Sequence, residues 1–403
     1  ESVLAALKQH RECVARQFDA MFELDVAETL SQATLFWQGA LDDAQALKMF
    51  GDLGYRDAAT VCERLRATRA SSRYLQLPET SRARLDSLIP MLIETSGGMP
   101  HPDETLIRTT DLLEAVSRRE TYLALLREND GALRKVQELA SASAWAAQYL
   151  SQHPILLDEL LDHRELAVAP DWPALKLRLQ HDLQQTDGDV ERQWDQLRHF
   201  KQAQMFQLIA QDVAGQLALE KLSDHLSDLA DCILDIALGG AWGVLRAAHC
   251  ESPQFCVIAY GKLGGKELGY GSDLDIIFLY DDEHPEAAEN YARLAQRLNS
   301  WLTTYTPSGV LYETDLRLRP DGASGLLVSS IQAFEEYQRR HAWLWEHQAL
   351  TRARFSVGNV RVGRIFERIR CDVLRQTRQS SVLRDEVIKM RDKMRQGHPI
   401  PSD

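Results

Sequence analysis

The stretch Gly271-Ser272-Asp273-Leu274-Asp275-Ile276-Ile277-Phe278 decides how this 403-residue chain is interpreted. Its apolar run predicts a β-strand over residues 274–280, and residues two apart in a strand project from the same face. Asp273 and Asp275 should therefore share one face, with their α-carbons about 6.5–7 Å apart. Two adjacent carboxylates repel each other unless a cation lies between them, and Mg²⁺ prefers carboxylate and phosphate oxygens. Taken alone, the motif also fits an exposed strand edge with solvated acids.

A glycine-rich segment, residues 261–272, precedes the two acids. It follows an apolar run over residues 255–260 that predicts a buried strand. Backbone N–H groups at the end of such a strand can approach an anion closely and form a phosphate cradle. The segment is not a Walker A loop, because Leu263 stands after Lys262 where that motif has Ser or Thr. Without the acids, a surface turn would be the better interpretation.

A third strand is predicted over residues 310–318, where polar and apolar residues alternate. Asp315, Arg317 and Arg319 would then share one face. A carboxylate for metal and arginines for phosphate form the combination that phosphoryl-transfer chemistry requires. The alternative is a surface ladder of salt bridges between residues i and i+2.

The region ahead of the first strand, about 245 residues, is rich in residues that favour helices. Apolar spacings of three and four predict helices over 197–217 and 222–236, and Gly239-Gly240 is expected to end the second. Breaks that contain glycine or proline divide this region into about three bundles, near residues 51–54, 96–100 and 169–173. More helices are predicted after the first strands, over 291–301, 334–350 and 362–395. We therefore expect a mostly α chain with an inserted α/β (α+β) domain, in which helical bundles flank a small mixed sheet.

Composition excludes several functional classes. The net charge of -13 gives no overall attraction for nucleic acid or for an anionic membrane, so neither is an expected partner. No run of 18 apolar residues predicts a membrane span, and no signal peptide is evident. The six cysteines form no CxxC pair, which argues against structural zinc and fits a reducing, cytoplasmic compartment.

The acidic motif resembles the polymerase-beta nucleotidyltransferase superfamily, in which a glycine and a small residue precede Asp-apolar-Asp by a spacer. Here the pair is Gly261-Lys262 and the spacer is residues 263–272, so Lys262 replaces the usual Gly or Ser. Longer stretches closely resemble glutamine synthetase adenylyltransferase, namely residues 259–275, 315–320 and 345–354, with helical matches at 153–161 and 200–204.

That family is bifunctional, since one half attaches AMP to a tyrosine of glutamine synthetase and a homologous half removes it by phosphorolysis. The sequence of residues 268–275 and 345–350 resembles that of the attaching half. The resemblance implies four parts: the last helix of the removing half at 1–22, a helical regulatory region at 23–245, the nucleotidyltransferase domain at 246–360, and the truncated start of a C-terminal helical bundle at 361–403. The chain would be a fragment of a longer protein.

The resemblance also implies an activity, namely transfer of AMP from ATP to a tyrosine of glutamine synthetase with release of pyrophosphate, which controls nitrogen assimilation. Asp273, Asp275 and Asp315 would be the catalytic and metal-binding residues and would hold two Mg²⁺ ions. ATP would contact six residues: Gly261, Lys262, Gly271, Ser272, Arg317 and Arg319. The tyrosine hydroxyl has a reference pKa of about 10, so metal coordination or Asp315 as general base would activate it.

The PII signalling protein and glutamine are the regulators that the resemblance implies. Two other functions fit parts of the sequence: a nucleotidyltransferase for a small molecule, and a regulatory scaffold that binds nucleotide or PII without catalysis. Three residues near the expected site, Trp343, Trp345 and His347, are expected to serve packing.

Overall fold

The computed structural model describes residues 30–161, 168–186, 188–245, 248–378 and 380–397. The chain divides into two compact units, residues 1–166 and 167–403. The helix expected at residues 1–22 lies outside the described ranges. No described helix is both long and apolar enough to cross a membrane.

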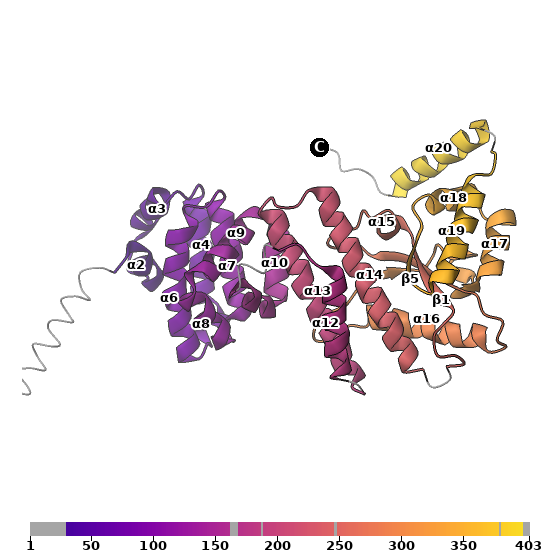
Figure 1. Cartoon of the computed structure of the whole chain (residues 1–403). Helices are drawn as coiled ribbons and strands as arrows, with labels where there is room; N and C mark the ends of the chain where they lie inside the picture. Colours follow the sequence, from indigo (N-terminus) through magenta and orange to yellow (C-terminus); the bar gives the residue numbers. More distant parts are fainter. Residues whose placement is uncertain (1–29, 162–167, 187, 246–247, 379, 398–403) are drawn as a thin grey trace, which may run out of the picture. The chain divides into compact units, whose positions relative to one another are not determined.

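The described part of the first unit consists of helices (Figure 1). The 18-residue α6 (Glu79–Ser96) packs against α2, α7 and α8 and buries a row of leucines and isoleucines. The other helices are α2 (Gln32–Gln38), α3 (Asp43–Asp52), α4 (Ala58–Ala70), α5 (Ser72–Leu75), α7 (Pro102–Val116), α8 (Glu120–Glu128), α9 (Asp130–Ala142), α10 (Ala144–Gln152) and the 3₁₀ helix η1 (Pro154–Leu161). The breaks expected near 51–54 and 96–100 lie at helix ends inside this one unit, and the break expected near 169–173 lies just after the start of the second unit.

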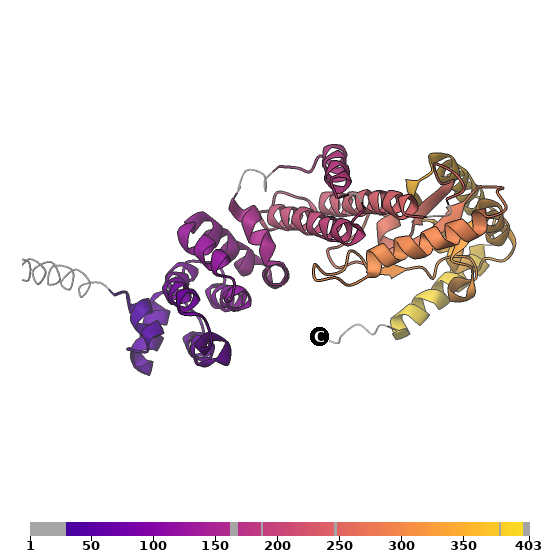
Figure 2. The same ribbon diagram turned by 90° about the horizontal axis from the view of Figure 1, so that it is seen from below.

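Three helices open the second unit: α12 (Trp172–Gln184), α13 (Val190–Val213) and α14 (Leu219–Gly243). The long helices α13 and α14 lie side by side (Figure 2). Contrary to the prediction, α14 continues through Gly239-Gly240. A Cβ on Gly240 would lie 2.5 Å from the ring of Trp301, so this glycine allows α16 (Ala287–Thr303) to approach closely.

A five-stranded mixed sheet forms the centre of the second unit, with the order β3-β2-β1-β5 and with β4 also paired to β2. The strands are β1 (Phe255–Ala259), β2 (Leu274–Tyr280), β3 (Thr314–Asp315), β4 (Val328–Ser330) and β5 (Arg354–Gly358). β1 is antiparallel to β2 and β5, whereas β3 and β4 are parallel to β2. The predicted fold class, mostly α with a small mixed sheet, is confirmed.

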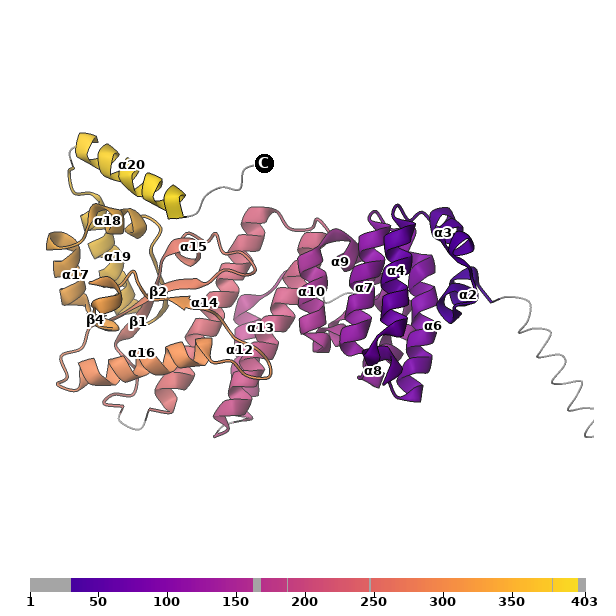
Figure 3. The ribbon, with the colours of Figure 1, turned by 180° about the vertical axis from the view of Figure 1, so that it is seen from behind.

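Helices cover both faces of the sheet (Figures 1 and 3). One face packs against α17 (Ile331–Arg340), α18 (Leu344–Leu350) and α19 (Val360–Leu374) around a core that includes Ile258, Ile277 and Phe366. On the other face, α14 and α16 pack near the stacked rings of Phe255 and Phe278. Three further elements complete the unit: the short α15 (Gly261–Gly264), the 3₁₀ helix η2 (Gly322–Ser324) and the 18-residue α20 (Ser380–Gly397).

Two helices predicted as continuous are interrupted. The helix predicted over 334–350 breaks before α18, where the backbone N–H of Trp343 donates to Glu346 Oε2 at 3.1 Å and starts a new helix. The helix predicted over 362–395 breaks after α19, because the Arg378 guanidinium donates to the last carbonyls of that helix, at Val373 and Leu374. In both places a side chain, of Glu346 or of Arg378, forms hydrogen bonds with backbone groups that would pair with each other if the helix continued.

Candidate active site

The predicted acids meet at one end of β2. β3 lies parallel to β2 with Asp275 beside Asp315, and Asp273 directly precedes β2. The backbone N–H of Leu274 donates to Glu313 O at 2.9 Å and holds β3 in this register. The structure therefore brings together three carboxylates that are 42 residues apart in sequence at their extremes.

Negative charge is concentrated around Asp275. Burial raises the pKa of its carboxyl, and the neighbouring Asp273 and Asp315 raise it further, against the opposing effect of Lys262 and Arg317. In the described part of the chain, no hydrogen bond holds the carboxylate of Asp273 or Asp275. Carboxylates in this state are suited to a cation, and their hard oxygen atoms fit Mg²⁺.

Gly261 allows the glycine-rich segment to approach these acids. Its φ of 52° lies in the left-handed region, and a Cβ there would lie 2.0 Å from Asp275 Oδ2. The adjacent backbone N–H of Tyr260 donates to Asp275 O at 2.8 Å. Position 261 thus requires glycine both for its backbone conformation and for the room that the carboxylate occupies.

The rest of the segment forms a compact loop after α15. The backbone N–H of Gly269 donates to Ser272 Oγ at 3.1 Å, which closes a turn just before Asp273. Lys262 is exposed and close enough to Asp275 to lower its pKa, while the α-carbon of Gly271 faces open space. Of the four residues predicted to contact ATP, Gly261 and Lys262 thus lie in α15, and Gly271 and Ser272 lie at the end of the loop.

Side chains distant in sequence fasten this loop. The Tyr270 hydroxyl donates to Asp212 Oδ2 of α13 at 2.9 Å, and Lys266 pairs with Asp228 of α14 at 3.0 Å. Glu267 also forms an ion pair with Arg352. Sequence reasoning missed these partners, because nothing local marks an acid on a helix as the anchor of a loop 38 or more residues away.

The predicted strand over residues 310–318 is wrong in its extent, since β3 contains only Thr314 and Asp315. The backbone N–H of Arg317 donates to Asp315 Oδ1 at 2.8 Å and its guanidinium donates to both carboxylate oxygens, so the chain turns here. The i,i+2 pairing, which was the alternative, occurs for these two residues. Its hydrogen bonds lower the pKa of Asp315.

Arg319 organises the loop after β3. Its guanidinium donates to the carbonyls of Leu316 at 2.8 Å, Ala323 at 2.9 Å and Gly325 at 3.2 Å. The Arg317 side chain, in contrast, is 79% exposed. The two arginines therefore do not lie along one strand face: Arg317 faces solvent beside Asp315, whereas Arg319 holds the loop.

The three residues expected to serve packing behave differently. His347 does pack, since its ring nitrogens contact Gln338 O at 2.8 Å and Arg378 at 3.0 Å, and burial lowers its pKa. Trp343 and Trp345 are 69% and 38% exposed, so their assignment to the core is wrong. Trp343 lies at the N-cap of α18 and Trp345 in its first turn.

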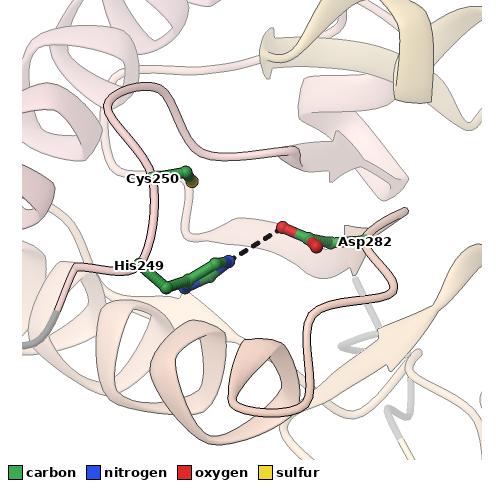
Figure 4. A group of neighbouring side chains, drawn as sticks. All are labelled: His249, Cys250 and Asp282. Atoms are coloured by element: carbon green, nitrogen blue, oxygen red, sulfur yellow. Dashed lines mark hydrogen bonds and ion pairs between the residues drawn. The ribbon is translucent and has the colours of Figure 1, made fainter.

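A second polar group lies at the ends of β1 and β2 that are opposite to the three acids (Figure 4). The ligand atoms of His249, Cys250 and Asp282 lie within 4.8 Å of one another, the one such group of three in the described ranges. Hydrogen bonds already satisfy it: His249 contacts Asp282 at 2.8 Å and Asn290 at 3.0 Å. Burial would raise the pKa of Asp282, but hydrogen bonds from His249 and Tyr291 help lower it to about 2. We interpret the group as a structural network.

Comparison with known families supports the interpretation of the first site. Residues 133–369, more than half of the chain, match the family model of glutamate-ammonia ligase adenylyltransferase. The chain belongs to this family. The match to the adenylyltransferase family includes the whole sheet and all three acids of the candidate site.

Curated members of the adenylyltransferase family are similar over nearly the whole chain. Each bears the name bifunctional glutamine synthetase adenylyltransferase/adenylyl-removing enzyme. The protein from Aromatoleum aromaticum is 53% identical over 402 residues, which cover 100% of this chain and 43% of that protein. The protein from Chromobacterium violaceum is 52% identical over 98% of this chain and 44% of its own length, and that from Neisseria meningitidis is 45% identical with the same coverage. The chain thus spans less than half the length of these relatives.

Proposed function

We propose that this chain carries an adenylyltransferase active site that moves AMP from ATP to a tyrosine of glutamine synthetase and releases pyrophosphate, and so controls nitrogen assimilation. The observation that carries the proposal is the meeting of Asp273, Asp275 and Asp315 beside the Gly261 turn. Family membership supports the reaction class, and the names of the relatives support the protein substrate.

Asp273, Asp275 and Asp315 are proposed to hold Mg²⁺, with two ions expected. The fit rests on the carboxylates of Asp273 and Asp275, which no hydrogen bond holds within the described residues, and on the burial and mutual repulsion that raise the pKa of Asp275. When bound, the metal supplies charge neutralisation at the phosphates and a lower pKa for a coordinated hydroxyl.

The loop residues Gly261, Lys262, Gly271 and Ser272 are proposed to bind the ATP phosphates. Backbone N–H groups supply directed donors, and the exposed ammonium of Lys262 adds positive charge. The guanidinium of Arg317 is accessible to the departing pyrophosphate. Arg319 would reach phosphate only by exchanging its carbonyl partners, so its first role is to shape the loop.

Asp315 is better suited to bind a cation than to accept a proton. Arg317 lowers its pKa, which keeps the carboxylate ionised and weakens it as a base. We therefore propose Asp315 as a ligand for the metal and not as the general base; a metal held by these acids would supply the lower pKa that the tyrosine hydroxyl needs.

The regulatory proposals rest on the family alone. PII and glutamine are proposed as regulators that act through the helical region at 23–245, with the nucleotidyltransferase domain at 246–360 and the first part of a further helical bundle at 361–403. A cytoplasmic location fits the use of ATP and of free cysteines such as Cys62, Cys232 and Cys256.

The decisive experiment incubates this chain with purified glutamine synthetase, Mg²⁺ and ATP labelled in the α-phosphate. The expected result is label on a tyrosine of glutamine synthetase and release of pyrophosphate. Asp273→Asn should abolish labelling while the circular dichroism spectrum stays unchanged. Asp224→Asn, an exposed acid on α14, is the matched control and should label normally.

Two outcomes would contradict the proposal. Normal labelling by Asp273→Asn would remove that carboxylate from the metal site. Phosphate-dependent release of ADP from adenylylated glutamine synthetase, without forward transfer, would assign the chain to the removing activity that the relatives' names also contain.

A further inference from the structure

Asp315 lies at the end of a segment with little regular structure. Residues 304–313 connect α16 to β3 and form one isolated bridge, between Thr306 and Gly309. β3 itself has two residues, fewer than the usual range of about 3–10. Pairing with β2 alone is therefore a weak constraint on the position of the Asp315 carboxylate.

Side chains of α13 add a further constraint to the β2 pairing and to the bond from Thr314 Oγ1 to Asn299 Oδ1 at 2.7 Å. Three of its residues, spaced over little more than one helical turn, donate hydrogen bonds to backbone carbonyls along the connecting segment. Arg198 donates to Trp301 at 3.4 Å, Thr304 at 2.5 Å and Gly309 at 2.7 Å, Gln202 donates to Ser308 at 2.7 Å, and Lys201 donates to Leu311. Acceptors on both sides of the turn in this segment are thus held by one helix.

Of the three residues of α13, Lys201 binds the backbone nearest to Asp315 in sequence, at Leu311. Its ammonium binds Leu311 O and lies 4.1 Å from the centroid of the Tyr312 ring, a cation–π contact. Tyr312 N–H in turn donates to Leu302 O at 3.0 Å, which ties the segment to the end of α16. In the described part of the chain, no carboxylate pairs with Lys201.

Burial of Arg198 and Lys201 costs the free energy of hydration of their charges. Arg198 is 1% exposed, and burial lowers its pKa. Burial and the neighbouring Arg198 lower the pKa of Lys201 to about 8. Apolar side chains could fill this space without the loss of hydration that a charge suffers. An apolar side chain cannot donate hydrogen bonds to backbone carbonyls. The carbonyl contacts therefore explain why cations occupy positions 198 and 201.

We propose that Lys201, supported by Arg198 and Gln202, is a positioning residue for Asp315. By fixing the backbone at Leu311 and Tyr312, it helps the β2 pairing to set the distance between the carboxylates of Asp315 and Asp275. The inference rests on the proposed function, in which these carboxylates share metal. A displacement of about 1 Å at a catalytic group can cost a factor of about 100 in rate.

The test compares Lys201→Met and Lys201→Arg with the unaltered chain. Methionine keeps most of the length of the side chain and removes the charge, whereas arginine keeps a cation that can bind the carbonyl. Lys221→Met, at an exposed lysine on α14, is the matched control. If the methionine variant does not fold, Lys201→Gln, which retains a donor without a charge, replaces it.

Three readouts are needed: Mn²⁺ affinity by electron paramagnetic resonance, deuterium exchange of residues 310–315, and the Mg²⁺ dependence of AMP transfer. For Lys201→Met we expect weaker Mn²⁺ binding and faster exchange. We also expect kcat to fall about tenfold or more, with little change in KM for ATP. Lys201→Arg should restore metal affinity, a result that a merely space-filling role does not predict.

Wild-type Mn²⁺ affinity and exchange in Lys201→Met would overturn the inference. So would equal losses in Lys201→Met and Lys201→Arg, because charge would then be irrelevant. The inference and the proposed function can fail separately. If no chain transfers AMP but Mn²⁺ affinity and exchange still distinguish the variants, positioning stands and the proposed transfer fails.

Discussion

At the scale of single residues, the contact between Gly261 and Asp275 leaves no space for a side chain. We predict that Gly261→Ala lowers AMP transfer about a hundredfold or more, because the new methyl group displaces the Asp275 carboxylate and strains a positive φ. Gly239→Ala, on α14 and outside the candidate site, is the control, since its Cβ would meet open space. Steady-state rates of both variants give the comparison, and equal rates would refute the steric argument.

The carboxylate of Asp275 should lower the stability of the metal-free protein at neutral pH although metal binding requires it. Its raised pKa means that the folded, metal-free protein holds this proton at a pH where the unfolded chain has lost it. Ionisation therefore costs stability above the folded pKa, and stability rises as the pH falls towards the unfolded pKa of about 3.9. We predict that Asp275→Asn raises the metal-free melting temperature at pH 7 by about 1–3 °C and abolishes Mn²⁺ binding. The stability gain should shrink as the pH is lowered towards 4, and a destabilised variant at pH 7 would contradict the argument.

At the scale of elements, local patterns were reliable where packing agrees with them. The alternation and apolar runs of β1 and β2 and the amphipathic spacing of α16 could be predicted, because these elements bury faces that the sequence marks. The short strands β4 and β5 were missed, since three to five residues carry too little periodicity. β3 was predicted too long because Arg317 bonds to Asp315 and turns the chain. Alternation of polar and apolar residues cannot distinguish a continuing strand from this i,i+2 pairing.

The same limit applies to the candidate site. The spacing of Asp273 and Asp275 within one strand made their proximity predictable, and Asp315 followed from its motif. The anchors of the site, such as Lys201 and Asp212, lie on helices whose residues show no local sign of their partners. Tertiary hydrogen bonds over 58 to 110 residues are outside what periodicity can indicate.

The glycine-rich loop should depend on its fastener at Tyr270. We predict that Tyr270→Phe, which removes the hydrogen bond to Asp212, increases deuterium exchange in residues 262–271 and raises KM for ATP about three- to tenfold. The reason is that a neutral donor to a charged acceptor contributes about 1.5–3 kcal/mol, part of which orders the loop. Tyr305→Phe, at a residue 78% exposed, is the control. Unchanged exchange in Tyr270→Phe would show that the ion pairs alone hold the loop.

At the scale of the whole molecule, the second unit has its own core around the mixed sheet. We predict that a fragment of residues 168–403 folds alone, shows one cooperative unfolding transition, and binds Mn²⁺ with the affinity of the full chain. Calorimetry and metal titration measure both properties. Loss of the transition in the fragment would mean that the first unit contributes to the stability of the sheet domain.

The two sides of the candidate site are fastened by different kinds of bond. Beside the hydrogen bond from Tyr270 to Asp212, the glycine-rich loop is held by partly exposed ion pairs, Lys266 with Asp228 and Arg352 with Glu267. The β3 side is held by α13 through backbone carbonyls. Dissolved salt screens exposed charges over a Debye length of about 8 Å at physiological ionic strength, but it hardly weakens bonds to buried carbonyls. Rising ionic strength should therefore loosen the nucleotide side of the site while the Asp315 side keeps its position. Under the proposed function, the salt concentration around the protein would thereby determine how tightly the loop holds ATP.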